Sequence, residues 1–308
     1  VSAAAAPGKV ARGERILMGT HFEIQIASLD IVGARHAIDA AFDEVARVEA
    51  LLSEWRPESE ISKVNRSAAD GPVSVGPELL EVVQRSVEFA KLTDGAFDIT
   101  FASCKGLWSF RTPRIPDDAE LAKCLQHVDS DKLIIDERAS TIRFASSGMQ
   151  IGIAAIGKGY GVDRAAAILE ARGFNDFFVD GGGEIRVSGA RFERPWSVGI
   201  ADPRKPGTLL RTLPVSEGAV ATSGDYEQYF EKDGVRYHHI LDPRTGKPAP
   251  ASVAVTVLAT TTIEADALAT GLFVMGPKAG LELVEKLPGV EAFFIDPDLV
   301  VHTSTNWK

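Results

Sequence analysis

The chain has 308 residues, of which 45% are hydrophobic and 25% are charged, proportions that are ordinary for a globular protein. It carries 43 acidic against 33 basic residues, a formal net charge of -10, and has no run of Lys or Arg. Nucleic acid and anionic membrane surfaces are therefore not expected as partners. No apolar stretch approaches the roughly 20 residues of a membrane-spanning helix, so no integral membrane segment is expected.

The first residues, VSAAAAPGKV, are small and rich in alanine. Such a start indicates the remnant of an export signal or an added tag, so residues 1–14 are predicted to form a tail and residues 15–308 one domain. An exported protein would work in the periplasm or at the cell envelope. Cys104 and Cys124 are the only cysteines, and their spacing leaves open whether they form one disulfide or stay as two thiols.

The first half of the chain mixes predicted strands and helices. Arg15–Ser28 ends in alternating apolar and polar residues, typical of a half-buried strand, and Val32–Ser53 has apolar residues at helical spacing. Ser53–Pro72 is polar, rich in turn-forming residues and predicted to be a loop. Further on, the signals predict a helix from Pro77 to Thr93, a short helix from Asp117 to Leu125, and strands at Lys132–Asp136 and Thr141–Ala145.

The second half is richer in glycine and in strands. A glycine-rich stretch, Ile151–Asp163, leads into a predicted helix, Arg164–Arg172. The remaining predicted elements are strands at Asp176–Asp180, Glu184–Gly189, Trp196–Ala201, Ala219–Gly224, Ser252–Ala259 and Val290–Asp296, a hairpin over Tyr226–Leu241 turned at Asp233-Gly234, and helices over Thr262–Gly276 and Pro277–Leu287. The pattern predicts an α+β fold with many antiparallel pairs.

The predicted helix Thr262–Gly276 carries Asp266 and Thr270 four residues apart, hence on one face. Two oxygen-bearing side chains on one helix face suit Mg²⁺, which prefers oxygen ligands. The alternative is ordinary: a Thr that bonds back to its own helix and a solvated Asp.

Three other motifs carry chemistry. Gly152–Gly159 resembles a phosphate-binding loop but has Gly159 where Ser or Thr would be needed. What remains is a glycine-rich backbone with Lys158 for an anionic ligand, or else a tight strand-to-helix turn with a solvated Lys158. The triple glycine Gly181–Gly183 does not form a dinucleotide fingerprint. The pair His238-His239 ends a predicted strand, so the two side chains point to opposite faces and at most one of them faces a given site. That histidine is either a general base or a structural group at the following turn.

Taken together, these segments resemble the ApbE-type flavin transferases. Single motifs are weak, but nine of them follow one another in the family's order from about Leu17 to Gly276. The matching runs are LMGTHFEI, SEWRPESEISKVN, TDGAFDIT, IGKGYGVDRAA, DGGGEI, WSVGIADP, AVATSGDYEQYF, HHILDPRTGKP and SVAVTVLA with EADALATGLFVMG.

The resemblance implies a single T-fold-like α+β unit of two related lobes, with mixed or antiparallel sheets, packed helices and the flavin between the lobes. It also implies an activity: with Mg²⁺, FMN is transferred from FAD to a Thr or Ser hydroxyl of an acceptor protein, and AMP is released. The acceptor would be a protein such as a subunit of a membrane redox complex. A NosX-type branch, linked to nitrous oxide respiration, is a hypothesis within the family.

The resemblance further assigns residues to these roles. The residues expected to line the FAD site are Met18, Trp55, Ala96, Phe97, Asp98, Lys158 and Leu241. The expected Mg²⁺ ligands are the side chains of Asp266 and Thr270 and the backbone oxygen of Ala155. His239 is the candidate base for the acceptor hydroxyl.

The chain departs from the family pattern at Gly152, where the family usually has Asp. Two alternatives to flavin transfer stay open at this stage. One is a Mg²⁺-dependent FAD pyrophosphatase, in which water replaces the acceptor and the products are FMN and AMP. The other is a flavin-binding protein without turnover.

Overall fold

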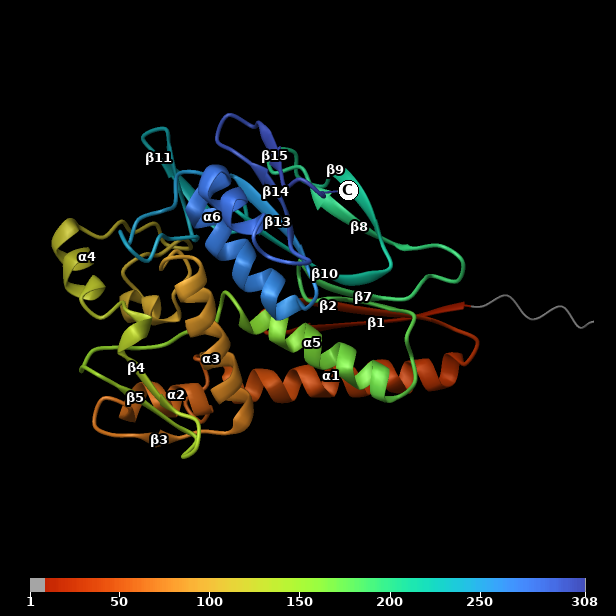
Figure 1. Ribbon diagram of the computed structural model, residues 1–308, viewed down its shortest axis with the longest axis horizontal. Coiled ribbons are helices and arrows are strands. Elements are labelled where there is room, and N and C mark those ends of the chain that lie inside the picture. The colour runs from red at the N-terminus through yellow and green to blue at the C-terminus, as the bar shows by residue number, and fades with distance from the viewer. Residues whose placement is uncertain (1–8, 308) are drawn as a thin grey trace, which may run out of the picture.

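An eight-stranded antiparallel sheet forms the centre of the protein, whose computed structural model describes residues 9–307 (Figure 1). The strand order is β1-β2-β6-β7-β10-β13-β14-β15. These strands are β1 (Lys9–Leu17), β2 (Thr20–Ser28), β6 (Phe177–Asp180), β7 (Glu184–Ser188), β10 (Glu217–Gly224), β13 (Ala254–Ala259), β14 (Glu291–Ile295) and β15 (Val301–Thr303).

Three helices cover one face of this sheet: α1 (Ile31–Leu52), α5 (Gly157–Ala171) and α6 (Thr262–Val284) (Figure 1). The opposite face packs against the hairpin of β8 (Trp196–Ala201) and β9 (Leu209–Val215). Alternate side chains of a strand point to opposite sides of a sheet. In the central strands both sets of side chains are apolar and buried, so both faces of the sheet are apolar. The sheet is therefore buried between a helical layer and a second β layer.

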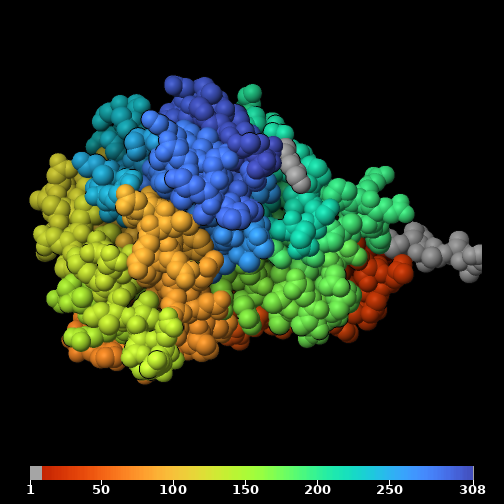
Figure 2. Space-filling model, in the orientation of Figure 1, coloured from red at the N-terminus to blue at the C-terminus, as the bar shows by residue number. Residues whose placement is uncertain are grey.

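A second group of elements packs beside the helical layer. It holds a three-stranded sheet of order β3-β5-β4, and Figure 2 shows α3 lying against α6. One apolar core runs from α3 through α6 to the large sheet, so the two groups share their interior. The elements are α2 (Glu60–Ser67), β3 (Val73–Ser74), α3 (Pro77–Leu92), the 3₁₀ helices η1 (Ile99–Cys104) and η2 (Ser130–Lys132), α4 (Asp118–Leu125), β4 (Leu133–Asp136) and β5 (Thr141–Phe144).

The residues predicted to mark the starts of two helices are confirmed. Asp117 caps α4 in a complete capping box with Glu120, and Pro77 is the first residue of α3. The predicted break between Gly276 and Pro277 is a kink inside α6, where Gly276 has a φ of 77°. The α+β class with antiparallel sheets is confirmed, whereas the relatedness of the two lobes stays a prediction.

Two element predictions are wrong. The predicted loop Ser53–Pro72 contains α2, whose cap Ser59 accepts from the Ser62 N–H at 3.2 Å and whose apolar side chains are too few to show a helical period. Helix α5 begins at Gly157 and not at Arg164, because its glycines permit close helix packing and do not form a turn. In addition, β3, β9 and β15 were not predicted.

The predicted domain boundary at residue 15 is also corrected. Strand β1 pairs with β2 along its whole length, from Lys9 opposite Ser28 to Leu17 opposite Thr20. Residues 9–14 therefore belong to the sheet, and their alternation was hidden by polar residues on this edge strand. Residues 1–8 of the predicted tail lie outside the described residues.

Helix α6 is the one described helix that is long and apolar enough to cross a membrane by length and composition. The expectation that no stretch comes near this limit is therefore corrected. More than half of its most apolar window is buried, and the helix contacts β10, β13 and α5. Its apolar character is explained by this position in the core.

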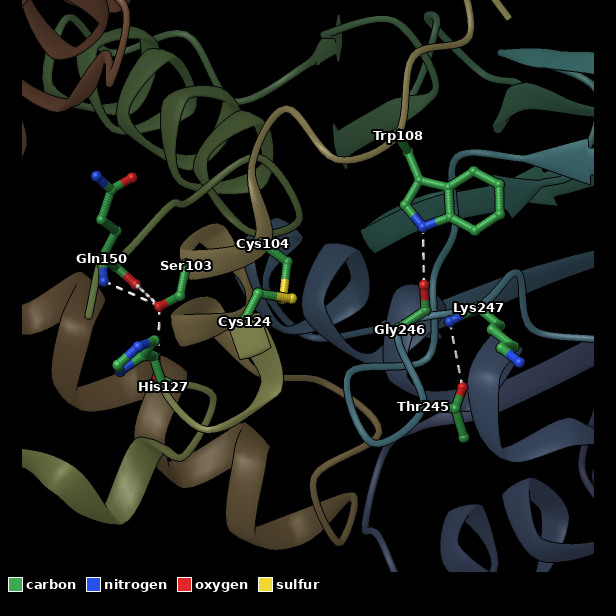
Figure 3. The surroundings of a disulfide bond; sticks show 9 residues. All are labelled: Ser103, Cys104, Trp108, Cys124, His127, Gln150, Thr245, Gly246 and Lys247. Atoms are coloured by element: carbon green, nitrogen blue, oxygen red, sulfur yellow. Dashed lines mark hydrogen bonds between the residues drawn. A yellow bond between two sulfur atoms is a disulfide. The ribbon is translucent and has the colours of Figure 1, made fainter. Parts of the chain in front are cut away.

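A disulfide joins Cys104 at the end of η1 to Cys124 in α4, with an S–S distance of 2.04 Å (Figure 3). This decides between the two alternatives that the spacing of the cysteines left open. The disulfide therefore closes residues 105–123 into a loop.

Candidate active site

The first turns of α5 and α6 meet at a close backbone contact. The Gly159 N–H donates to Asp266 Oδ2 at 2.9 Å. A Cβ on Gly159 would lie 2.8 Å from the Asp266 Cβ and even closer to the Thr262 carbonyl oxygen, so only glycine fits. This junction brings Asp266, predicted from the helix pattern, next to the glycine-rich segment predicted to hold an anion.

Lys158 and Glu184 form a partly buried ion pair beside Asp266. The distance from Lys158 Nζ to Glu184 Oε1 is 2.5 Å, and the Glu184 side chain is 5% exposed. Burial raises the pKa of Glu184, and the charge of Asp266 raises it further. Burial lowers the pKa of Lys158, but the two carboxylates outweigh burial and the net direction is upward. Two acidic groups thus surround one ammonium group.

Glu184 was not among the predicted site residues. It begins β7 directly after the triple glycine, a run that lacks a dinucleotide fingerprint and so pointed to no site. A signal was present, since a Glu is rarely placed at a buried position of a strand without a charged partner.

This cluster fits a divalent cation by its own composition. Asp266 is 4% exposed, and Glu184 Oε2 is buried without a hydrogen-bond partner. A buried, unpaired acidic oxygen is costly unless a cation or donor compensates it. Among residues 9–307 no group of three or more His, Cys, Asp and Glu side chains is arranged to hold a metal, so a cation here would also need neutral oxygen ligands.

The neutral ligands predicted for the cation lie on the elements that flank Asp266. Ala155 is half-buried in the turn directly before α5. Thr270 is one helical turn after Asp266 on α6, and its Oγ1 lies 3.4 Å from the Ser223 Oγ on β10. The assignment of Ala155, Asp266 and Thr270 as ligands stays a prediction.

His239 directly follows β12 (Val235–His238), which pairs with β11 (Tyr229–Lys232). Its backbone N–H donates to the Gln228 carbonyl at 3.0 Å, while its Nδ1 is buried without a partner. Burial lowers the pKa of His239 to about 4, and the charge of Lys158 contributes in the same direction. The imidazole is therefore neutral at pH 7 and lies within the electrostatic reach of Lys158.

The neighbouring His238 has a structural role. Its Nε2 lies 3.1 Å from the Ala249 carbonyl oxygen, and its ring meets Phe273 edge-on at 5.5 Å between centroids. The two histidines thus have separate surroundings, as the alternation along the strand predicted.

Three predicted FAD residues pack close to these helices. Met18 lies in the β1–β2 turn with a φ of 50°, and its sulfur fills the space beside Gly161 of α5. Ala96 and Phe97 are buried, and Phe97 Cβ lies 3.3 Å from where a Cβ of Gly271 would be. Their side chains serve the core, and their contact with FAD stays a prediction.

Asp98 holds its own segment together. Its Oδ1 accepts from the Thr100 N–H at 2.8 Å and the Thr100 hydroxyl at 2.6 Å, and its Oδ2 accepts from the Ser130 N–H at 3.0 Å. Burial raises the pKa of this carboxyl group, while these donors counteract the rise. Asp98 therefore caps η1 and joins it to η2. Its contact with FAD stays a prediction.

Trp55 is 77% exposed, and Lys105 Nζ lies 3.6 Å from its ring centroid. The adjacent Glu54 carboxylate is 3.3 Å from the same Lys105 Nζ and 2.9 Å from where a Cβ of Gly152 would be. Glu54 and Ala102 therefore fill the space beside Gly152, and an aspartate there would displace them. The space that a side chain at position 152 would need is therefore already occupied.

Leu241 pairs with Pro248 across the turn that follows His239. Trp108, from the segment closed by the disulfide, donates its Nε1–H to the Gly246 carbonyl at 2.8 Å in this turn (Figure 3). The Trp108 ring also lies 5.9 Å from the Tyr237 ring on β12. The disulfide-closed segment thus supports the turn and the strand on both sides of His239.

Comparisons with known proteins give one consistent result. The profile of the ApbE family matches residues 18–294. A FAD:protein FMN transferase of Treponema pallidum is 33% identical over 308 residues, which cover 94% of this chain and 85% of that protein.

Solved structures agree with this match. The ApbE protein of Thermotoga maritima has a TM-score of 0.88 at 32% identity, covering 96% of this chain and 97% of that one. The flavin transferase ApbE of Vibrio cholerae has a TM-score of 0.85 at 31% identity, covering 97% and 98%. The similarity extends over nearly the whole chain in both sequence and fold.

Proposed function

The chain belongs to the ApbE family, and from this premise we propose how its site carries out the family's reaction. It is a FAD:protein FMN transferase, which transfers flavin from FAD to an acceptor protein. The finer proposal is that a Thr or Ser hydroxyl of the acceptor receives FMN, that AMP is released, and that Mg²⁺ is required.

The observation that carries this proposal is His239, whose buried Nδ1 has no hydrogen-bond partner and whose imidazole lies within the electrostatic reach of Lys158. Burial lowers its pKa to about 4, so at neutral pH the imidazole is unprotonated and has a free nitrogen lone pair for a proton. Lys158 supplies a positive charge for the pyrophosphate of FAD. Phosphoryl transfer to a hydroxyl requires both a base for the hydroxyl proton and a group that binds the phosphate charge.

The proposed reaction balances as a single displacement. The acceptor hydroxyl gives its proton to His239 while its oxygen bonds to the FMN-side phosphorus. The bond from this phosphorus to the AMP oxygen breaks, and AMP leaves. His239 then returns the proton to solvent.

The cation would be held by the Asp266 and Thr270 side chains and the Ala155 backbone oxygen. When bound, Mg²⁺ supplies charge neutralisation at the pyrophosphate. Asp266 is already oriented by the Gly159 N–H, and the buried position of this pair excludes bulk water from one side of the site.

The test is the intact mass of an acceptor protein after incubation with FAD, Mg²⁺ and the enzyme. We expect the mass to increase by one FMN and flavin fluorescence to stay with the denatured acceptor.

Asp266→Ala should lower the rate of transfer about 10³-fold, whereas Asp70→Ala, at an exposed turn, should not change it. Transfer by Asp266→Ala at the parent rate would refute the cation assignment. AMP release without acceptor measures the competing hydrolysis of FAD.

We also propose an exported location, in the periplasm or cell envelope, with a membrane redox subunit as acceptor. The Cys104–Cys124 disulfide supports the location, because disulfides persist in oxidising compartments. Fractionation of cells that express the protein checks it, with the protein expected outside the cytoplasm.

A further inference from the structure

Helices α5 and α6 both begin without a side-chain cap of their own. Ile156 precedes α5 and Thr261 precedes α6, and neither makes a side-chain cap hydrogen bond. The first backbone N–H groups of a helix need acceptors, and a buried helix start without them is unfavourable.

Each helix obtains a carboxylate from the other. Asp163, in the second turn of α5, accepts from the Thr262 N–H with Oδ1 at 2.9 Å and from the Ile263 N–H with Oδ2 at 2.8 Å. In return, Asp266 of α6 accepts from the Gly159 N–H of α5 at 2.9 Å. The two helix starts are therefore capped reciprocally.

We propose that Asp163 is a positioning residue for the cation site, an inference that rests on the proposed function. Both oxygens of Asp163 are bound to α6, so this side chain determines where α6 lies along α5. Asp266 is on one helix and Lys158 on the other. The distance between the groups assigned to the cation and to the pyrophosphate is thus set by Asp163.

The probe is Mn²⁺, titrated into the protein with and without FAD and followed by the magnetic resonance signal of the free ion. Asp163→Asn keeps one acceptor oxygen and places an amide NH₂ opposite a backbone N–H. We expect the Kd for Mn²⁺ to rise about tenfold, as for other residues that orient metal ligands. Quenching of flavin fluorescence gives the Kd for FAD in parallel, and this Kd should rise as well.

Asp117→Ala is the matched control for loss of a cap. Asp117 caps α4, away from the junction, so its loss should lower the melting temperature and leave both Kd values unchanged. Asp163→Asn with parent Kd values for Mn²⁺ and FAD would show that Asp163 is only a cap.

A double variant, Asp163→Asn with Thr261→Asp, separates capping from positioning. Thr261 has the extended backbone of a cap residue, so an aspartate there caps α6 locally without a bond to α5. We expect the melting temperature to return to the parent value while the Kd for Mn²⁺ stays raised. Recovery of both would overturn the proposal. If the parent itself binds no Mn²⁺, the proposed cation site is wrong, and the Kd for FAD still decides the role of Asp163.

Discussion

The α5–α6 junction and the region around His239 are built in different ways. The junction joins helices of 15 and 23 residues through backbone N–H groups, buried carboxylates and a glycine contact. His239 follows a strand of four residues, supported by aromatic rings and by a segment that a disulfide closes.

Under the proposed assignment, the difference separates two tasks of the enzyme. The junction assigned to FAD and the cation is held together by hydrogen bonds from backbone N–H groups to side-chain carboxylates. The side assigned to the acceptor depends on side-chain packing of short elements. Changes in one region are therefore expected to leave the other's measurable property intact.

The largest expected effect is on the acceptor side. His239→Ala should lower the rate of transfer about 10³-fold, because the hydroxyl loses its base, while the Kd for FAD stays within twofold. The measurement is single-turnover transfer with a fluorescent readout. His238→Ala is the control: it loses a bond to Ala249 and a contact with Phe273, so it should lose stability and keep most of the rate. A larger rate loss in the control would reverse the two assignments.

Removal of the disulfide should come next. Cys104→Ser together with Cys124→Ser frees the loop between them and should lower the free energy of unfolding by about 3 kcal/mol. Urea unfolding measures this. Transfer to the acceptor should weaken because Trp108 is no longer anchored, yet the Kd for Mn²⁺ should not change. A shifted Kd for Mn²⁺ would mean that the two regions are coupled.

A smaller effect is expected from Glu184→Gln. The amide still accepts a bond from Lys158 but lacks the charge that holds it, so the KM for FAD should rise about tenfold. Stability should change little, because the buried carboxylate is costly, as its raised pKa indicates, but its loss leaves the Lys158 ammonium without this partner.

The control for Glu184→Gln is Glu44→Gln. Hydrogen bonds from Arg47 lower the pKa of Glu44 to about 2, so its charge is favourable in the folded state. Its replacement should reduce stability by about 1 kcal/mol and leave the KM for FAD unchanged. Calorimetry and steady-state kinetics together distinguish the two variants, and equal behaviour of both would contradict the comparison.

The smallest effect is the pH dependence near neutrality. Since the pKa of His239 is lowered to about 4, the neutral base predominates above about pH 5. The kcat/KM for transfer should therefore be almost constant between pH 6 and 8 and fall as the pH decreases through about 4. An acid limb near 6.5, the ordinary value for histidine, would show that His239 is not buried in this way.

Much of the fold was predictable because its signals are local. The apolar spacing in α1, the capping box of α4 and the alternation in β2 act within a few residues, and all three elements were identified. Helix α2 was missed because eight residues with few apolar positions show no clear period. The start of α5 was misplaced because glycines that permit helix packing look the same in sequence as glycines of a turn.

The candidate site was predicted in part for the same reason. Asp266 and Thr270 share a helix face by spacing alone, and the order of the motifs supplied the remaining residues through family resemblance. Glu184 and Asp163 were not predicted, because their partners, Lys158, Thr262 and Ile263, lie far away in the chain. Nothing in the residues next to a carboxylate reveals a donor that only folding brings close.

By itself, the sequence determined the class of fold, the ends of most helices and the family, since these depend on periodicity, capping and motif order. Only the tertiary structure decided that Cys104 and Cys124 are joined, that Lys158 pairs with Glu184, and that α5 and α6 cap each other. The physical reason is that burial and long-range contact set these bonds. Both properties belong to the packed chain and to no single segment of it.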